Sequence, residues 1–455
     1  MRVSHGVTAV FDDPNLVSSA GLVPVLRLAD RAGLDRLVAA HVTVPGSGGA
    51  NAAGKVRSLI AGMVAGADCI DDMDVLRHGG MDRLMSGVRA PSTLGTFLRG
   101  FTFGHVRQLD AVASRLLAAL AERAPVLPGA AEVAYVDVDD TVRQTYGYAK
   151  QGAGRGYTGT KGLNALLATV STPGSAPVIC ATRLRKGSTV SARGAARLVA
   201  DALVTARAAG ASGLAVLRAD AAFYRHDVVA AAGRGGARFS ITARHDSATR
   251  RSIEAIPADA WTPIKYTHAV WDETTQAWIS DAQVAETTHT AFTTGAKTKR
   301  VTARLIVRRV PDLNPATQSE LFTVYRYHAV FTDSPLPMLQ AEKAHRAHAI
   351  IEQVIADLKN GPLAHLPSGH FWANSAWLVC AAIAYNLTRV AGTLASAAHA
   401  RATTATLRRQ LIAVPAHLTR SARRLILHLP TRWPWQDAWT KLWTRICGPP
   451  RTASS

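Results

Sequence analysis

The first quarter of the chain has the hydrophobic pattern of helices. From about Leu16 to Ala124, apolar residues recur at spacings of three and four, as in the segment LVPVLRLADRAGLDRLVAAHV. We therefore predict a helical N-terminal region over residues 1–126. Within it, Pro91, a Ser92 or Thr93 cap and a helix ending near Gly100 are compatible with a helix-turn-helix. An ordinary helical hairpin has the same pattern and is the favoured interpretation.

The segment LPGAA at residues 127–131 marks a change from helical to strand periodicity. The segments VAYVDVDDTV, GLNALLATVS and APVICATRL are short, apolar and bounded by turn residues, which predicts an antiparallel meander of three strands. A helix from about Ser191 to Gly210, the strand GLAVLRAD, a helix from about Ala222 and the strand ARFSITAR follow. The predicted order over residues 127–249 is βββαβαβ.

Residues 250–337 alternate with the two-residue period of a sheet, as in RVTARLIVRRV, and are predicted to be a β-rich insertion. Residues 338–395 return to helices, the first of which is expected to stop at Asn360-Gly361, and residues 396–455 form a basic tail. A βββαβαβ core closed by a helix is the element order of the ribonuclease-H-like fold. We expect an α/β protein with such a mixed sheet and flanking helices, a β-rich insertion and a helical N-terminal domain.

Composition narrows the class of protein. The 455 residues are 48% hydrophobic, which is enough for a sizeable core. The 52 Lys and Arg against 32 Asp and Glu give a net charge of +20, which predicts a polyanionic partner, with nucleic acid first and an anionic membrane surface second. Four scattered cysteines without a C-x-x-C pair suggest neither a zinc site nor a disulfide framework, in keeping with a reducing cytoplasm.

A membrane location and secretion are not expected. The N-terminal segment has acids where a signal peptide carries its apolar run, and no charge-free apolar stretch of about 18 residues appears. The segment ANSAWLVCAAIAYNL, which comes nearest, contains Asn374 and Asn386 and is interpreted as a buried helix.

Three acidic positions stand out because they end or interrupt apolar elements. Period two places Asp137 and Asp139 on one face of the first strand, Asp220 closes the strand LAVLRAD, and Glu352 lies on the closing helix. Strand ends of this kind converge in a parallel arrangement, so Asp137 or Asp139, Asp220 and Glu352 are candidates to hold Mg²⁺ for phosphoryl transfer. The simpler alternatives are a helix cap for Asp220, a solvated helix face for Glu352 and a strand-end turn for Asp140.

The closing helix and the connections offer candidate DNA contacts. About 100° per residue places His345, His348, Glu352 and Lys359 together, away from the apolar face of Ile350, Ile351, Val354 and Leu358. The glycine-rich stretch GAGRGYTGTKG fails the tests for a phosphate loop and reads as a hairpin whose Arg155 and Lys161 are plausible contacts to the DNA backbone.

The predicted insertion and the tail add further basic and aromatic residues. Trp271 and Trp278 are candidates to stack on an unpaired base, although packing inside the β module is the favoured role. Arg308 and Arg309, with Lys297, Lys299 and Arg300 nearby, are candidates for phosphate binding. In the tail, the four-residue spacing of Trp435, Trp439 and Trp443 favours a packing stripe, and the arginines are the better DNA candidates.

These motifs resemble the DDE transposases of bacterial insertion sequences, most closely the insertion-sequence 1380 group. The resemblance runs through the segments PSTLGTFLRGF, YVDVDDT, GYTGTKGLNALLATVS, LRADAAFY, IIEQVIADLKNGPLAHLPSGHFWANSAWLVCAAIAYNL and WPWQDAW. It implies a catalytic Asp in the Asp-x-Asp-x-Thr strand, with Asp139 favoured over Asp137, a second in LRAD (Asp220), and Glu352 followed by Lys359. His345 and His348 stand where the wider group has Tyr and Arg.

The resemblance implies a DNA transposase that cuts the ends of its element and joins them to target DNA with Mg²⁺ or Mn²⁺. It also implies a homodimer on double-stranded DNA, located in the bacterial cytoplasm with the nucleoid. The alternatives are a catalytically silent DNA-binding protein derived from such an enzyme and a non-transposing nuclease of the same fold. Inverted repeats that flank the gene would distinguish a transposase from a nuclease.

Overall fold

The computed structural model describes residues 6–146, 149–156, 159–265, 267, 269–273, 277–279, 282–311, 324–422 and 424–449. The chain forms two compact units. Unit 1 contains residues 1–124, 149–151 and 357–455, and unit 2 contains residues 125–148 and 152–356. Residues 357–395, which the sequence pattern grouped with the catalytic core, thus lie in unit 1 with the N-terminal helices.

Unit 1 is mainly helical. Its helices are α1 (Leu22–Arg31), α2 (Leu34–His41), η1 (Ser47–Gly49), α3 (Ala52–Ala65), η2 (Asp71–Leu76), α4 (Met81–Leu84), α5 (Pro91–Arg99), α6 (Phe103–Ala121), α12 (Phe371–Ala395), α13 (Ala397–Arg401), α14 (Thr404–Leu407), the π-helix η7 (Arg408–Ile412) and α15 (Gln436–Cys447). The predicted helix ending near Gly100 is confirmed as α5, and Gly100-Phe101-Thr102 links it to α6.

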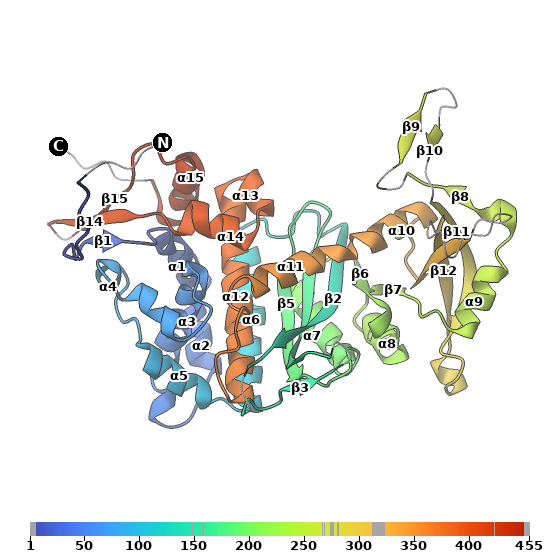
Figure 1. Ribbon diagram of the computed structural model, residues 1–455, viewed down its shortest axis with the longest axis horizontal. Helices are drawn as coiled ribbons and strands as arrows, with labels where there is room; N and C mark the ends of the chain where they lie inside the picture. Colours follow the sequence, from blue (N-terminus) through green and yellow to red (C-terminus); the bar gives the residue numbers. More distant parts are fainter. Residues whose placement is uncertain are drawn as a thin grey trace. The chain divides into compact units, whose positions relative to one another are not determined.

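The apolar helix α12 is the centre of unit 1. It packs against α3, α5, α6 and α15, and Figure 1 shows it alongside α6. Trp377 is fully buried, and its indole Nε1 donates to the carbonyl oxygen of Pro362 at 2.6 Å. Among the described residues α12 alone is long and apolar enough to cross a membrane, but 94% of its most apolar window is buried inside the protein. The predicted buried helix is confirmed.

A small sheet joins the two ends of the chain in unit 1. The strand β1 (Leu16–Val17) pairs with β14 (Ala416–Ser421), which pairs with β15 (Arg424–His428), all antiparallel. The sequence pattern gave no strand at either place, because β1 is two residues long and its partner is nearly the whole chain away. The region predicted as a basic tail is therefore folded onto the N-terminal segment.

Unit 2 is built on one mixed sheet with flanking helices. Its strand order is β3-β4-β2-β6-β7-β13-β12-β11-β8, with β5 on β4. The first strands are β2 (Val133–Gln144), β3 (Gly154–Arg155), β4 (Lys161–Ser171), β5 (Val178–Lys186), β6 (Leu214–Ala219) and β7 (Arg238–Thr242). The predicted meander is confirmed, since β2–β4 and β4–β5 pair antiparallel, while β2–β6 and β6–β7 pair parallel. Helix α7 (Ala195–Ala208) packs on β2, β4 and β5, and α8 (His226–Arg234) packs on β7 (Figure 1).

The β-rich residues 250–337 extend this sheet instead of forming a separate module. The strands are β8 (Thr262–Pro263), β11 (Gln283–Ala291), β12 (Val301–Pro311) and β13 (Tyr325–Thr332), with β9 (Val270–Asp272) and β10 (Ala277–Ile279) as a separate hairpin. The strand β13 pairs with β7, with Phe331 opposite Ile241, and so continues the core ladder. The short helices α9 (Ser247–Glu254), η3 (Ala221–Phe223), η4 (Ala258–Ala260) and η5 (Lys297–Lys299) complete this part of the chain.

The predicted closing helix of about twenty residues is broken in its middle. It consists of α10 (Met338–Arg346), the 3-10 turn η6 (Ala347–Ala349) and α11 (Ile350–Lys359). The predicted stop at Asn360-Gly361 is confirmed. The break matters because it changes the direction of Glu352 relative to His345, and the structure buries His345 and exposes Glu352.

Candidate active site

The strand β2 lies inside the sheet and carries three carboxylates in four residues. It pairs with β4 on one side and β6 on the other, and Val136 and Val138 are fully buried on one face. Ionised carboxylates in such a place need cations or hydrogen-bond donors. The structure gives the three acids different partners.

Asp137 is held by an arginine on the neighbouring strand. Its side chain is completely buried, and its Cα partner across the parallel β2–β6 ladder is Arg218. The guanidinium donates through Nε to Oδ1 at 2.6 Å and through Nη2 to Oδ2 at 2.7 Å, a bidentate pair. His348 Nδ1 donates to the same Oδ1 at 3.0 Å. Burial alone raises the pKa of Asp137, but Arg218 and His348 outweigh it and the pKa is lowered.

Asp140 is held by a second arginine. Arg185 on β5 donates to Asp140 Oδ2 and to Asn164 Oδ1, and Asn164 Nδ2 donates to Asp140 Oδ2 at 2.7 Å. The predicted strand-end turn is wrong, because β2 continues to Gln144 and Asp140 sits in register with Leu166 of β4. The sequence pattern missed Arg218, Arg185 and Asn164. The available signal was a charged or amide side chain inside an otherwise apolar strand.

Asp139 and Asp220 have no such arginine. Val138 of β2 is in register with Ala219 of β6, so Asp139 and Asp220 are the next residues along two neighbouring parallel strands. Asp139 Oδ1 accepts from the Asp140 backbone N–H at 2.7 Å, and Asp220 Oδ1 accepts from the Ala222 N–H at 2.9 Å as the cap of η3. Within the described residues neither side chain forms an ion pair with a Lys, Arg or His.

The electrostatics of this pair differ from those of Asp137. Burial raises the pKa of Asp139 from 3.8 to about 6, and repulsion from Asp220 adds to the shift. Burial also raises the pKa of Asp220. His348 acts in the opposite direction on both groups. Two adjacent carboxylates whose charge is left uncompensated favour the binding of a cation.

Glu352 lies on α11, one turn beyond His348. Its side chain is exposed and makes no hydrogen bond or ion pair within the described part of the chain. Among the described residues, ligand atoms of Glu352, Asp139 and Asp220 do not all lie within 4.8 Å of one another. The stretch before Glu352 contacts the sheet through His348, whose imidazole reaches Asp137 on β2. The apolar face predicted for this helix is present, since Ile351, Val354 and Leu358 are buried.

His345 is enclosed where the sequence pattern expected a contact to DNA. Its ring nitrogens are hydrogen-bonded to Ser240 Oγ and Thr242 Oγ1 on β7, each at 3.0 Å. Burial, reinforced by His348 and Arg218, lowers the pKa of His345 to about 3. The ring is therefore neutral at pH 7, and both of its nitrogens are hydrogen-bonded inside the protein. We therefore interpret His345 as a structural residue. His348 is only partly buried and stays a candidate for contact with DNA.

The other candidate contacts to the DNA backbone are three basic residues that are partly or fully exposed. Arg155 is exposed on β3 and donates to the Gly159 carbonyl at 2.9 Å, and Lys161 is partly exposed at the start of β4. Lys359, in the last turn of α11, is partly exposed and belongs to unit 1. These three positions leave the ammonium or guanidinium groups near solvent.

In the predicted insertion, Trp271 is exposed, whereas Arg308 and Arg309 contact other residues of unit 2. Trp271 is 42% exposed and is in register with Trp278 across the β9–β10 hairpin, while the side chain of Trp278 lies outside the described residues. Arg308 pairs with the buried Glu342 at 3.2 Å. The Arg309 guanidinium lies over the rings of Trp261 and Tyr325 at 4.1 and 4.5 Å. Both arginines are thus engaged within unit 2.

In the C-terminal part of unit 1, two of the three predicted tryptophans pack as the spacing predicts, whereas Trp435 lies before α15 and its ring contacts Trp433. Trp439 is buried, and its ring stacks on Trp443 with centroids 5.1 Å apart. Both line a groove of about 1230 Å³ that also includes Arg27 and Arg57.

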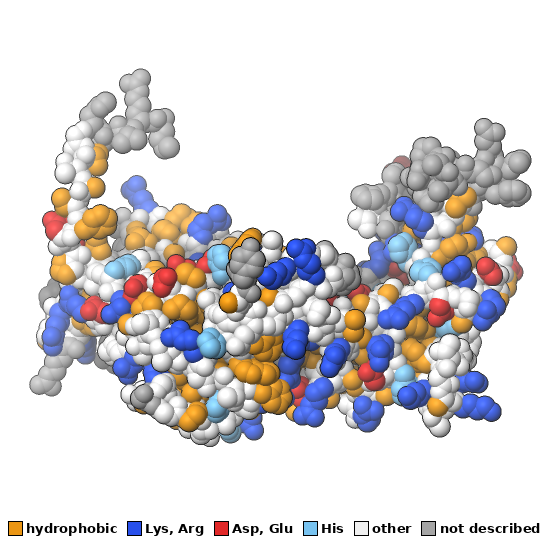
Figure 2. Space-filling model, turned by 60° about the horizontal axis from the view of Figure 1, so that its bottom comes forward, with side chains coloured by type: hydrophobic (Ala, Val, Ile, Leu, Met, Phe, Trp, Pro, Cys, Tyr) orange, Lys and Arg blue, Asp and Glu red, His pale blue; other side chains and the backbone are white. Residues whose placement is uncertain are grey.

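Basic side chains cover much of the surface. Figure 2 shows Lys and Arg across the face in view, with fewer Asp and Glu between them. This distribution agrees with the net charge of +20 and with an anionic partner.

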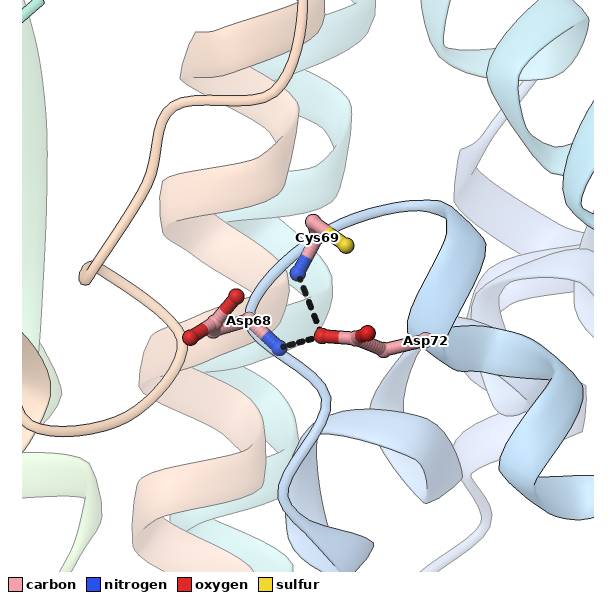
Figure 3. A group of neighbouring side chains, drawn as sticks. All are labelled: Asp68, Cys69 and Asp72. Atoms are coloured by element: carbon pink, nitrogen blue, oxygen red, sulfur yellow. Dashed lines mark hydrogen bonds between the residues drawn. The ribbon is translucent and has the colours of Figure 1, made fainter.

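A second group of possible metal ligands occurs in unit 1. Atoms of Asp68, Cys69 and Asp72 lie within 4.8 Å of one another (Figure 3). Asp72 Oδ2 accepts from the backbone N–H groups of Asp68 and Cys69 at 3.2 and 3.3 Å, and Asp68 accepts from His365 Nδ1. These hydrogen bonds explain why the three side chains lie together: they stabilise the local structure at the start of η2.

Asp139 and Asp220 fit a hard divalent cation better. Carboxylate oxygens are the ligands that Mg²⁺ and Mn²⁺ prefer, and here the carboxylates of the partly buried Asp139 and the exposed Asp220 are adjacent and form no ion pair within the described residues. The donor set contains no thiolate or imidazole that would select a softer metal.

Comparison with known proteins identifies the family of the chain. A model of the transposase DDE domain, group 1, matches residues 2–449, and a search of curated proteins finds no match. The chain belongs to the group 1 family of DDE transposase domains, whose members are transposases acting on DNA.

Proposed function

We propose that this protein is a DNA transposase that cleaves the ends of an insertion sequence and joins them to target DNA. Asp139, Asp220 and Glu352 supply the ligands for Mg²⁺ or Mn²⁺ in a ribonuclease-H-like core. The observation that carries the proposal is the contrast between the acids: Asp137 and Asp140 are paired with arginines, while Asp139 and Asp220 are adjacent and unpaired.

The residues divide into three roles in this proposal. When bound, the divalent ions would activate water for cleavage and then the new 3′-hydroxyl for joining. Asp139 on β2 and Asp220 directly after β6 supply oxygen ligands, and Glu352 contributes a third from α11. Asp137 is not a ligand, because both of its oxygens are committed to Arg218. His348 uses Nδ1 for Asp137, which leaves Nε2 for a DNA phosphate.

DNA binding involves further parts of the chain in this account. We assign phosphate contacts to Arg155, Lys161 and Lys359, and stacking on an unpaired base to Trp271 and Trp278 of the β9–β10 hairpin. Arg308 and Arg309 act by supporting the sheet, and His345 by fixing α10, because their polar groups are engaged internally. We further propose membership of the insertion-sequence 1380 group, a homodimer on two ends, and DNA binding by residues 1–126 and 396–455.

The test is cleavage of labelled DNA that carries the inverted repeat flanking the gene. With Mg²⁺ or Mn²⁺, the wild type is expected to cut at the repeat end and to join the product to a target plasmid. Asp139→Asn, Asp220→Asn and Glu352→Gln should each lower cutting by at least about 100-fold while still binding the repeat. Glu254→Gln is the matched control, because Glu254 is also exposed on a helix of unit 2.

Each other outcome has a definite meaning. Undiminished cutting by the Asp220 or Glu352 variant would contradict the ligand assignment. Cutting without joining, at DNA that lacks the repeat, would identify a nuclease. Binding without metal-dependent cutting by the wild type would identify a silent DNA-binding derivative.

A further inference from the structure

Arg218 connects three separate elements of unit 2. It lies on β6, two residues before Asp220, and its side chain is only 3% exposed. Nε and Nη2 bind the two oxygens of Asp137 on β2, and Nη1 donates to the carbonyl oxygen of Ala344 in α10. The guanidinium also lies over the ring of Tyr135 at 4.1 Å. One buried cation therefore joins two strands to the helix that leads to Glu352.

The stretch from Ala344 to His348 is fixed at further points. His348 donates to Asp137 on β2, and His345 is hydrogen-bonded to Ser240 and Thr242 on β7. The rings of His345 and His348 are nearly parallel, with centroids 6.4 Å apart. These contacts tie the last turn of α10 and the turn η6 to β2, β6 and β7.

The fixed stretch overlaps the break in the helix, and the break changes the direction of Glu352. A 3-10 turn rotates about 120° per residue against about 100° in an α-helix, so the three residues of η6 add roughly 60°. An unbroken helix would place Glu352 within about 20° of the buried His345. With the added rotation Glu352 stands about 40° to the other side of His345, and its side chain is exposed.

We propose that Arg218 is a positioning residue that, through Asp137, His348 and the Ala344 carbonyl, sets where Glu352 stands relative to Asp139 and Asp220. The inference rests on the proposed function, since it concerns the third ligand of that same site. Arginine is required because one planar group directs two donors to Asp137 and a third to the Ala344 carbonyl, whereas a lysine ammonium is a single point of charge. Arg218 itself touches neither metal nor DNA in this account.

The test is a double-mutant cycle between Arg218→Lys and Glu352→Gln on the full chain. Mn²⁺ affinity is read from the electron paramagnetic resonance signal of the free ion, which does not depend on activity. If Arg218 acts through Glu352, Arg218→Lys weakens Mn²⁺ binding about tenfold in the wild-type background. In the Glu352→Gln background the same substitution should change the affinity by less than about twofold.

Two variants separate positioning from stability. Arg185→Lys alters the other buried arginine of the sheet, which binds Asp140 and Asn164 but has no bond to α10. It should lower the melting temperature and leave the Mn²⁺ affinity within about twofold of the wild type. The apolar pair Asp137→Leu/Arg218→Met removes both buried charges together and should fold, because no unpaired charge is left behind. It should still lose about tenfold in Mn²⁺ affinity, and it replaces Arg218→Lys in the cycle if that variant does not fold.

The contradicting results are distinct. Equal losses from Arg218→Lys in both backgrounds, or wild-type affinity in the apolar pair, would overturn the positioning role alone. Wild-type Mn²⁺ affinity in Asp139→Asn and Asp220→Asn would overturn the metal site itself, and with it the proposed function.

Discussion

The aspartates on β2 and at the end of β6 fall into two groups, which the fold treats in opposite ways. Asp137 meets Arg218 and Asp140 meets Arg185, and each of these carboxylates is compensated within the fold. Asp139 and Asp220 are adjacent, and within the described residues neither forms an ion pair, although His348 acts to lower the pKa of both. The difference shows that the neighbouring strand, more than the acid itself, decides which carboxylate is structural and which is left for a ligand.

The comparison predicts its largest effect at Asp137. Asp137→Ala leaves Arg218 buried without its partner, which should cost about 3–5 kcal/mol in the free energy of unfolding. Asp139→Ala leaves no buried cation without its partner, so it should lower the free energy of unfolding far less. Denaturant unfolding of metal-free protein measures both. A smaller loss for Asp137→Ala than for Asp139→Ala would reverse the assignment of the two neighbours.

The second effect is at Asp140. Asp140→Ala removes the shared partner of Arg185 and Asn164 and should lower the free energy of unfolding by about 2–3 kcal/mol. The pair Asp140→Leu/Arg185→Met, which leaves no buried charge, should recover most of this loss in the same denaturant experiment. A further loss in the double variant would mean that the ion pair itself, and not the stranded arginine, dominates.

The third effect depends on pH and has the opposite sign. The pKa of Asp139 is raised to about 6 in the folded protein, so its favourable contribution is complete below about pH 4 and is lost as the pH rises through 6. At pH 8 the ionised group is destabilising in metal-free protein, and Asp139→Asn should raise the free energy of unfolding by about 1–3 kcal/mol. At pH 4 that gain should be absent. Chemical unfolding at the two pH values tests this, and a gain of equal size at both would show that Asp139 does not titrate with a raised pKa.

The smallest effect is expected for an exposed pair. Arg225 and Asp227 are 3.0 Å apart, with about half of each side chain exposed. Water screens such pairs, so Arg225→Ala should change the free energy of unfolding by less than about 0.5 kcal/mol. Titration with denaturant at low and high salt provides the measurement. A loss as large as that of Asp137→Ala would show that burial does not determine how much an ion pair contributes to the free energy of unfolding.

The sequence pattern was sufficient to predict the strands and helices but not which residues pair between them. The period of two in β2 and the acid that closes LRAD identified the strands and their acids, because these signals are local. The pairing of Asp137 with Arg218 depends on the register of two strands 81 residues apart, and no local pattern contains it. The same holds for β1 with β14, and for β13, whose pairing with β7 turns a predicted insertion into a continuation of the sheet.

The break in the closing helix could not be predicted from the sequence, because it too lies next to contacts with distant strands. Residues 338–359 have a continuous helical pattern. The 3-10 turn directly follows the end of α10 that Arg218, Ser240 and Thr242 bind, and its own His348 binds Asp137. Tertiary contacts override the local preference there. An unbroken helical wheel therefore grouped His345 with Glu352, whereas the fold buries one and exposes the other.

The central claim is that Asp139 and Asp220 form a metal site because the fold leaves them uncompensated. Calorimetric titration of Mn²⁺ into wild type, Asp139→Asn, Asp220→Asn and the control Glu254→Gln tests it most directly. The account predicts saturable binding by the wild type and the control, and loss of that binding in both aspartate variants. Binding of wild-type strength by the aspartate variants would contradict it.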